Sequence, residues 1–128
     1  EFTRRHPDIA GLWLNATGGR ADQVEAALRE RGLRYARTTP VPLEDLPGVL
    51  MAADLHLICL SNAFVGYVLP SKVYACIASS KPILFVGSRE SDVHYLCEKA
   101  LTSTTYQQVA VGDTDRACAA LEALLTVA

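Results

Sequence analysis

Apolar, strand-like runs alternate with helix-like segments along most of this chain. Residues 9–14 and 55–60 are two such runs, and a third at 83–86 follows a helix-like segment at 71–78. Parallel strands need a crossover connection between them, which is usually a helix. The alternation recurs about five times with short connections and predicts an α/β fold with a doubly wound, Rossmann-like parallel sheet. We expect one domain of this kind over residues 1–128.

The segment 55–60 is almost uninterrupted in its apolar character and contains Leu57, Ile58 and Cys59. Strands that are covered by helices on both faces have this composition. We therefore expect this strand to be buried on both faces. His56 lies inside the segment, so we expect it to be a core or sheet-end histidine rather than a catalytic one.

Composition excludes several classes of function. The chain has a formal net charge of -2, and 20% of its residues are charged. It has no excess of cations to displace counterions from a duplex, which argues against a nucleic-acid partner. No apolar run reaches the roughly 18 residues that cross a bilayer, so we expect a cytoplasmic protein. Neither the four cysteines nor the three histidines have metal-ligand spacing, so we expect reduced, buried thiols and no metal site.

The start of the helix near residue 70 is the strongest candidate site. Pro70 suits the first position of a helix, and the amides of Lys72 and Val73 then have no intrahelical acceptor. Together with Ser71, the Lys72 ammonium and the positive end of the helix dipole, these amides form a candidate phosphate site. A solvated lysine in an ordinary first turn remains the alternative. Cations are disfavoured at a helix start, so a bound anion would explain why Lys72 stands there.

Several short motifs together resemble a known family. They are Leu-Glu-Asp-Leu-Pro at 43–47, Ala-Ala-Asp at 52–54, Pro-Ser-Lys-Val-Tyr at 70–74 and Ala-Ser-Ser-Lys-Pro at 78–82. On these residues the chain resembles the C-terminal, donor-binding domain of group 1 retaining glycosyltransferases with the GT-B fold. The resemblance covers residues 9–125 and is sharpest in the Pro-Ser-Lys helix and the strand after Lys-Pro.

The resemblance implies that this chain is the nucleotide-sugar-binding part of a longer, two-domain enzyme whose missing N-terminal half holds the acceptor. The opening of the sequence on helix-like residues, without an initiating methionine, leads to the same expectation. Such an enzyme would transfer a sugar from a nucleotide diphosphate donor to a glycan or lipid-linked acceptor in cell-surface polysaccharide synthesis. A lipid acceptor would bring the full-length protein to a membrane surface.

The resemblance also implies which residues bind the donor. They are Gly66, Tyr67, Ser71, Lys72 and Val73 near the diphosphate, and Thr38 near the base. Helix dipoles and cations neutralise the leaving diphosphate in these enzymes, so neither a metal nor a cofactor is expected. The nucleotide diphosphate sugar is itself the substrate.

Three positions depart from the family pattern. Many members have two glutamates eight positions apart, the second of which binds the ribose hydroxyls, and Tyr67 and Ala75 stand at these positions. Ser80 stands where the family usually has glycine. The basic pair that relatives use on the diphosphate lies upstream of the matched region, so no catalytic residue is assigned and the isolated fragment is expected to be inactive. A degenerate docking module without catalysis and a GT-B-like sugar-nucleotide epimerase therefore remain alternatives.

The loop after the predicted strand at 83–86 is a second candidate, because ligands of α/β sheets bind at the carboxyl ends of strands. Glu90 and Asp92 could bind sugar hydroxyls there. They could also stabilise the start of a helix that Ser91 caps, which is the interpretation we favour. His94 on this helix is placed within reach of the cleft.

Overall fold

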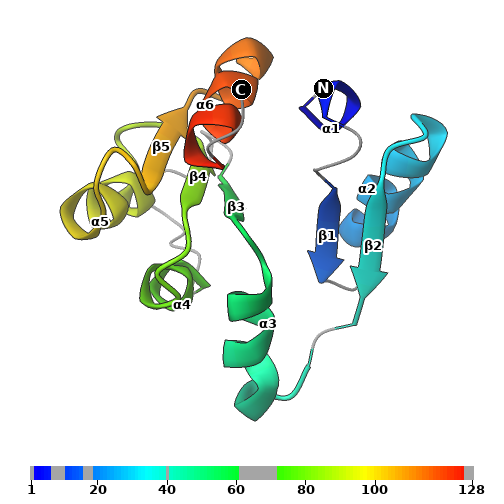
Figure 1. Cartoon of the computed structure of the whole chain (residues 1–128), viewed down its shortest axis with the longest axis horizontal. Coiled ribbons are helices and arrows are strands. Elements are labelled where there is room, and N and C mark those ends of the chain that lie inside the picture. Colours follow the sequence, from blue (N-terminus) through cyan, green and yellow to red (C-terminus); the bar gives the residue numbers. More distant parts are fainter. Residues whose placement is uncertain (1, 7–10, 16–18, 40, 61–71, 126–128) are drawn as a thin grey trace. The chain divides into compact units, whose positions relative to one another are not determined.

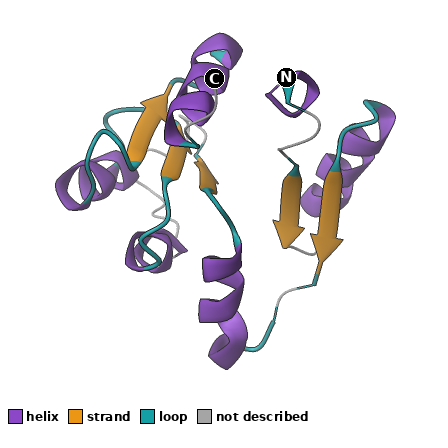
Figure 2. Ribbon diagram, viewed as in Figure 1, coloured by secondary structure: helices purple, strands orange, loops and turns teal. Residues whose placement is uncertain are grey.

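The structure of the chain is a computed structural model that describes residues 2–6, 11–15, 19–39, 41–60 and 72–125 (Figure 1). The chain forms two compact units, Glu1–Leu46 and Pro47–Ala128. Helices alternate with strands in both, and the strands pair in parallel (Figure 2). The α/β class and the parallel pairing predicted from the sequence are confirmed. A single domain over the whole chain stays a prediction.

The first unit is built from two strands and the helix between them. β1 (Leu12–Asn15) leads through α2 (Gly19–Glu30) to β2 (Tyr35–Thr38), and the two strands pair in parallel. A short helix, α1 (Phe2–Arg5), precedes them, and a 3₁₀ turn, η1 (Leu43–Asp45), follows. Gly32 ends the helical segment with φ at +63°, a conformation that costs glycine nothing because it has no Cβ.

The second unit contains a three-stranded sheet in the order β3-β4-β5. The strands are β3 (His56–Cys59), β4 (Ile83–Val86) and β5 (Tyr106–Val109). The helices are α3 (Leu46–Ala52), α4 (Lys72–Ala78), α5 (Asp92–Ala100) and α6 (Thr114–Leu124). Because the three strands run in the same direction, their carboxyl ends share one edge of the sheet.

The central strand β4 is buried on both faces. Ile83 and Phe85 pack into a core cluster with residues of α4 and α5, whereas Leu84 packs into a second cluster with residues of α6. Successive side chains of a strand point to opposite faces, so the two clusters lie on opposite faces of the sheet. Helices therefore cover both faces, as the doubly wound pattern predicts.

The prediction that the strand at 55–60 is buried on both faces is wrong. In β3, Ile58 is buried, but Leu57 is 50% exposed and Cys59 is also exposed. The physical reason is position: β3 is the end strand of its three-stranded sheet, whereas β4 has a neighbour on each side. Ile58 lies on the face that α4 and α5 cover, whereas Leu57 lies on the other face, where α6 packs on β4 and β5.

Two helix starts are capped by side chains. The Ser91 Oγ accepts a hydrogen bond of 3.0 Å from the Val93 amide, so the predicted cap of α5 is confirmed. Asp113 caps α6 by accepting from the Arg116 amide at 3.2 Å. Asp92 lies in the first turn of α5, where a carboxylate interacts favourably with the helix dipole.

The turn after α4 holds Ser80 in a left-handed backbone conformation. Ser80 adopts φ at +62°, and its amide donates to the Ile77 carbonyl at 3.2 Å to close the end of the helix. Residues with a Cβ are strained in this left-handed region, whereas glycine is not. Serine at this position therefore keeps the turn at a cost in backbone energy.

We predict that Ser80→Gly stabilises the chain by about 0.5 to 1 kcal/mol, because relief of the left-handed strain outweighs the larger entropy of the unfolded chain. The measurement is the free energy of unfolding from urea denaturation. Ser103→Gly is the matched control: Ser103 is an exposed residue without a positive φ, so it should lose stability. Equal losses at both positions would contradict the strain at Ser80.

Candidate functional site

The predicted phosphate site falls at the start of α4, and only part of it lies among the described residues. Gly66, Tyr67 and Ser71 lie outside them, and Lys72 is described through its backbone as the first residue of α4. The helix follows the expected motif closely, since it runs from Lys72 to Ala78 and leads into β4 through Lys81 and Pro82. The predicted helix boundaries are thus confirmed to within a residue.

Val73 anchors this helix start in the core. Its side chain is fully buried and belongs to the cluster that also contains Cys76 and Phe85. A ligand at this point would therefore meet the backbone amide of Val73 and not its side chain. Burial of Val73 fixes the position of the first turn relative to the sheet.

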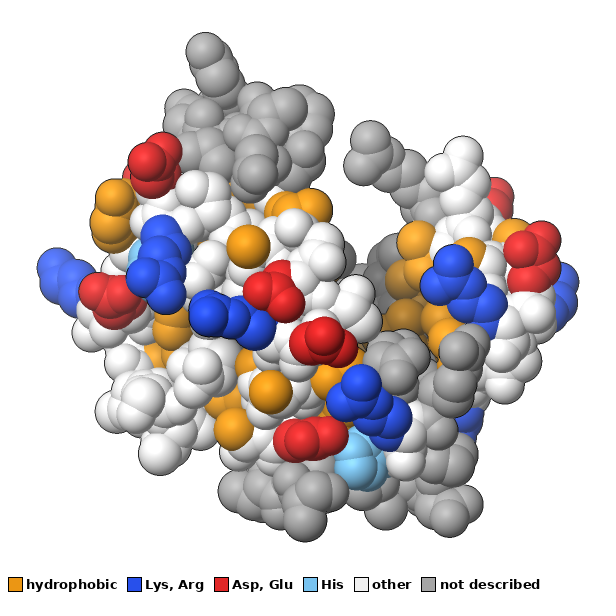
Figure 3. Space-filling view, turned by 90° about the horizontal axis from the view of Figure 1, so that it is seen from above, with side chains coloured by type: hydrophobic (Ala, Val, Ile, Leu, Met, Phe, Trp, Pro, Cys, Tyr) orange, Lys and Arg blue, Asp and Glu red, His pale blue; other side chains and the backbone are white. Residues whose placement is uncertain are grey.

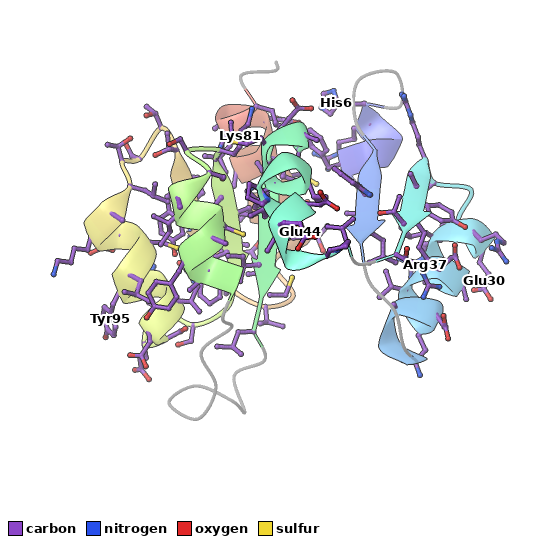
Figure 4. All side chains as sticks on the ribbon, turned by 90° about the horizontal axis from the view of Figure 1, so that it is seen from below. His6, Glu30, Arg37, Glu44, Lys81 and Tyr95 are labelled. Carbon is purple, nitrogen blue, oxygen red and sulfur yellow. The ribbon has the colours of Figure 1, made fainter. Side chains whose placement is uncertain are left out.

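Thr38 lies in the other unit, at the end of β2 and opposite Asn15 of β1. Its Oγ1 accepts a hydrogen bond of 2.7 Å from the indole Nε1 of Trp13, which is 38% exposed. The preceding residue, Arg37, is directed to α2 (Figure 4). Its Nη1 lies 2.8 Å from Asp22 Oδ1 and 3.0 Å from Glu25 Oε1, which raises the pKa of Arg37 through these hydrogen bonds. The Thr38 side chain is thus exposed and lies beside an aromatic ring. Arg37, on the same strand, is hydrogen-bonded to two carboxylates of α2.

The carboxyl ends of β4 and β5 meet at a second group of polar residues. The Gly87 amide donates to the Val109 carbonyl at 2.9 Å, so the pairing continues one residue beyond β4. A Cβ at Gly87 would lie 2.9 Å from Cε1 of the buried Phe85 ring, so only glycine fits. The loop that follows therefore starts from a fixed backbone position.

An arginine extends from this loop along the end of β5. The Arg89 Nε donates to Gln108 Oε1 at 3.1 Å, and Gln108 Nε2 donates to the Gly87 carbonyl at 2.5 Å. The sequence prediction named the loop but missed both residues. Two weak signals pointed to these residues. One is the rule that ligands bind at the carboxyl ends of strands, and the other is a glutamine at a half-buried position of a strand.

His94 was expected within reach of the carboxyl ends of the strands, but its hydrogen bond is to the beginning of β5, and it shares a cavity with Arg89. Its Nδ1 lies 2.8 Å from the Tyr106 hydroxyl at the beginning of β5, and its Nε2 lies 2.9 Å from Glu98 Oε2. Burial, with smaller contributions from Cys97 and Glu98, raises the pKa of Tyr106, so the phenol stays protonated. A cavity of about 480 Å³ is lined by His94, Glu98 and Tyr106, together with Thr102, Gln107 and Arg89. A protonated phenol is a hydrogen-bond donor and not a nucleophile. Its contact with His94 links α5 to β5.

His56 occupies the opposite, amino-terminal end of the sheet. Its imidazole is hydrogen-bonded to the backbone of Leu50, and its Nε2 is buried without a hydrogen-bond partner among the described residues. Burial, and secondarily the nearby positive charge of Lys81, lower the pKa of His56, although the bond to Leu50 opposes them. The core interpretation of His56 agrees with this environment.

We predict that His56 makes the second unit less stable in mild acid. Its pKa is lower in the folded chain than its ordinary value of 6.5, so the unfolded chain takes up a proton first. The free energy of unfolding should be fully retained above this value and should fall as the pH drops below it. Urea denaturation between pH 5 and 8 measures the slope.

His56→Gln should flatten this slope, and Lys81→Gln should flatten it partly because it removes the nearby positive charge. Above pH 7 the difference in unfolding free energy between each variant and the parent chain should be constant. Equal slopes for His56→Gln and the parent chain below pH 6.5 would contradict the prediction.

Surface charge is mixed on the face that Figure 3 draws, where acidic and basic side chains lie interspersed among apolar ones. Among the described residues, no group of three or more His, Cys, Asp or Glu side chains is placed to hold a metal ion. In the same part of the chain, no helix has both the length and the apolar character to cross a membrane.

No protein family, curated protein or solved structure matches this chain. The functional interpretation therefore depends on the motif residues and on the geometry of the sheet and its helices.

Proposed function

We propose that this chain is the donor-binding domain of a retaining glycosyltransferase that uses a nucleotide diphosphate sugar. The observation that supports the proposal best is the unit formed by α4 and β4. The helix begins at Lys72 within the Pro-Ser-Lys motif, and the strand follows Lys81-Pro82. Both elements are held in place by the core cluster around Phe85.

The chemistry required of such a domain suits this geometry. Transfer of the sugar leaves a nucleoside diphosphate, whose developing negative charge must be stabilised. Unpaired amides at a helix start, the helix dipole and the ammonium of Lys72 would all act on that charge. None of these groups has to exchange a proton, so this half of the enzyme needs no acid or base.

The remaining parts of the proposal concern the whole protein. An N-terminal half would hold a glycan or lipid-linked acceptor, and the product would serve cell-surface polysaccharide synthesis. The reaction would take place in the cytoplasm, with a lipid acceptor drawing the enzyme to a membrane surface. Tyr67 and Ala75 favour a second candidate, a docking module that keeps the fold without donor binding, because neither side chain can bind ribose as a carboxylate does.

We predict that Lys72→Ala weakens the binding of a nucleoside diphosphate by about 1 to 3 kcal/mol, the usual range for a hydrogen bond to a charged group. Calorimetric titration of the intact protein with uridine, guanosine and thymidine diphosphates, without metal, measures the change. Lys99→Ala is the matched control, because Lys99 is an exposed lysine in the last turn of α5.

Binding of one nucleoside diphosphate that depends on Lys72 and not on Lys99 would support the donor-binding domain. Equal affinities of the parent protein and Lys72→Ala would contradict the role of Lys72. If none of the three diphosphates binds, the donor-binding proposal fails and the docking module is favoured.

A further inference from the structure

Arg89 is held more firmly than an exposed arginine usually is. Its Nε donates to Gln108 Oε1 at 3.1 Å, and the same amide group donates through Nε2 to the Gly87 carbonyl at 2.5 Å. Gly87 is itself bonded to Val109. The guanidinium is thus tied, through one half-buried glutamine, to the backbone at the ends of β4 and β5. This anchoring lowers the rotamer entropy that Arg89 would lose on binding a ligand.

The anchoring contact uses only the Nε of Arg89. A guanidinium has further N–H donors at its two terminal nitrogens, arranged as a planar fork that matches two oxygens of a phosphate or carboxylate. The hydrogen bond from Nε to Gln108 restricts the orientations that the guanidinium plane can adopt. The residue is therefore prepared for bidentate binding of an oxyanion.

Arg89 also lines a second cavity, together with another arginine. The cavity measures about 390 Å³ and lies at the carboxyl ends of β4 and β5. Its charged side chains are Arg89, Arg116 and Asp113. Asp113 Oδ2 lies 3.6 Å from the Nε of Arg116. The cavity is thus lined by two guanidinium groups and one carboxylate, which pairs with Arg116. The charge left uncompensated is positive.

We propose that this cavity binds a phosphate group, with Arg89 as a direct ligand and Gln108 as the residue that positions it. Phosphate is favoured over a neutral ligand by the two guanidinium groups. It is favoured over a single carboxylate because its additional oxygens can accept from Arg116 as well as from the fork of Arg89. This site is separate from the start of α4, so it is tested independently of the proposed donor site.

The test is a titration of the chain with inorganic phosphate, followed by two-dimensional ¹H–¹⁵N NMR at constant ionic strength. We expect saturable shifts of the Arg89 Nε–H signal and of the Ser88 and Arg89 amides. Arg89→Lys keeps the charge but loses the fork and should weaken binding by about fivefold or more. Gln108→Leu leaves Arg89 in the chain but removes the hydrogen bond that orients its guanidinium, and should also weaken binding.

Arg31→Lys is the matched control, because Arg31 is exposed and lies in the other unit. It should leave the affinity for phosphate unchanged. If Gln108→Leu does not fold, Arg89→Lys decides alone, since an exposed side chain can be exchanged without loss of the core. Absence of saturable shifts, or equal effects of Arg89→Lys and Arg31→Lys, would overturn the proposal and leave only non-specific attraction of anions.

Discussion

The burial of β4 between two core clusters determines the arrangement of the second unit. Ile83 and Phe85 are fully buried on one face, and Leu84 is 1% exposed on the other. Full burial of each such side chain contributes about 1.5 to 3 kcal/mol to the stability of the fold. Both faces of β4 therefore need helices that cover them. With α4 and α5 on one face and α6 on the other, the loops that end the strands are left at one edge. Both proposed sites depend on this layering.

The sequence predicted the elements of this layering well, because their signals are local. The strand at Ile83–Val86 has the predicted bounds, and Ser91 caps α5 through its own hydroxyl two residues before Val93. Burial was harder to predict. Residues 55–60 read as a strand covered on both faces, yet Leu57 is exposed because β3 stands at the end of its sheet. Strand order depends on contacts between distant segments, which an apolar run does not reveal.

The candidate sites show the same limit. The start of α4 could be named from Pro70 and Lys72, because helix starts have a sequence signature. The pairing of Arg89 with Gln108 could not, because nineteen positions separate them and neither belongs to a motif. Only the rule for carboxyl ends pointed to their loop. His94 was placed within reach of the cleft by its helix, whereas its hydrogen bond is to Tyr106 at the beginning of β5.

We infer that the carboxyl edge of the sheet around β4 is its ligand-binding edge. The most direct measurement is a map of amide shifts over the second unit during titration with the nucleoside diphosphate that binds. We expect shifts at the carboxyl ends of the strands and the start of α4, namely at Leu60, Lys72, Val73 and Gly87. Shifts gathered instead at His56, Lys81 and Thr105, at the amino ends, would contradict it.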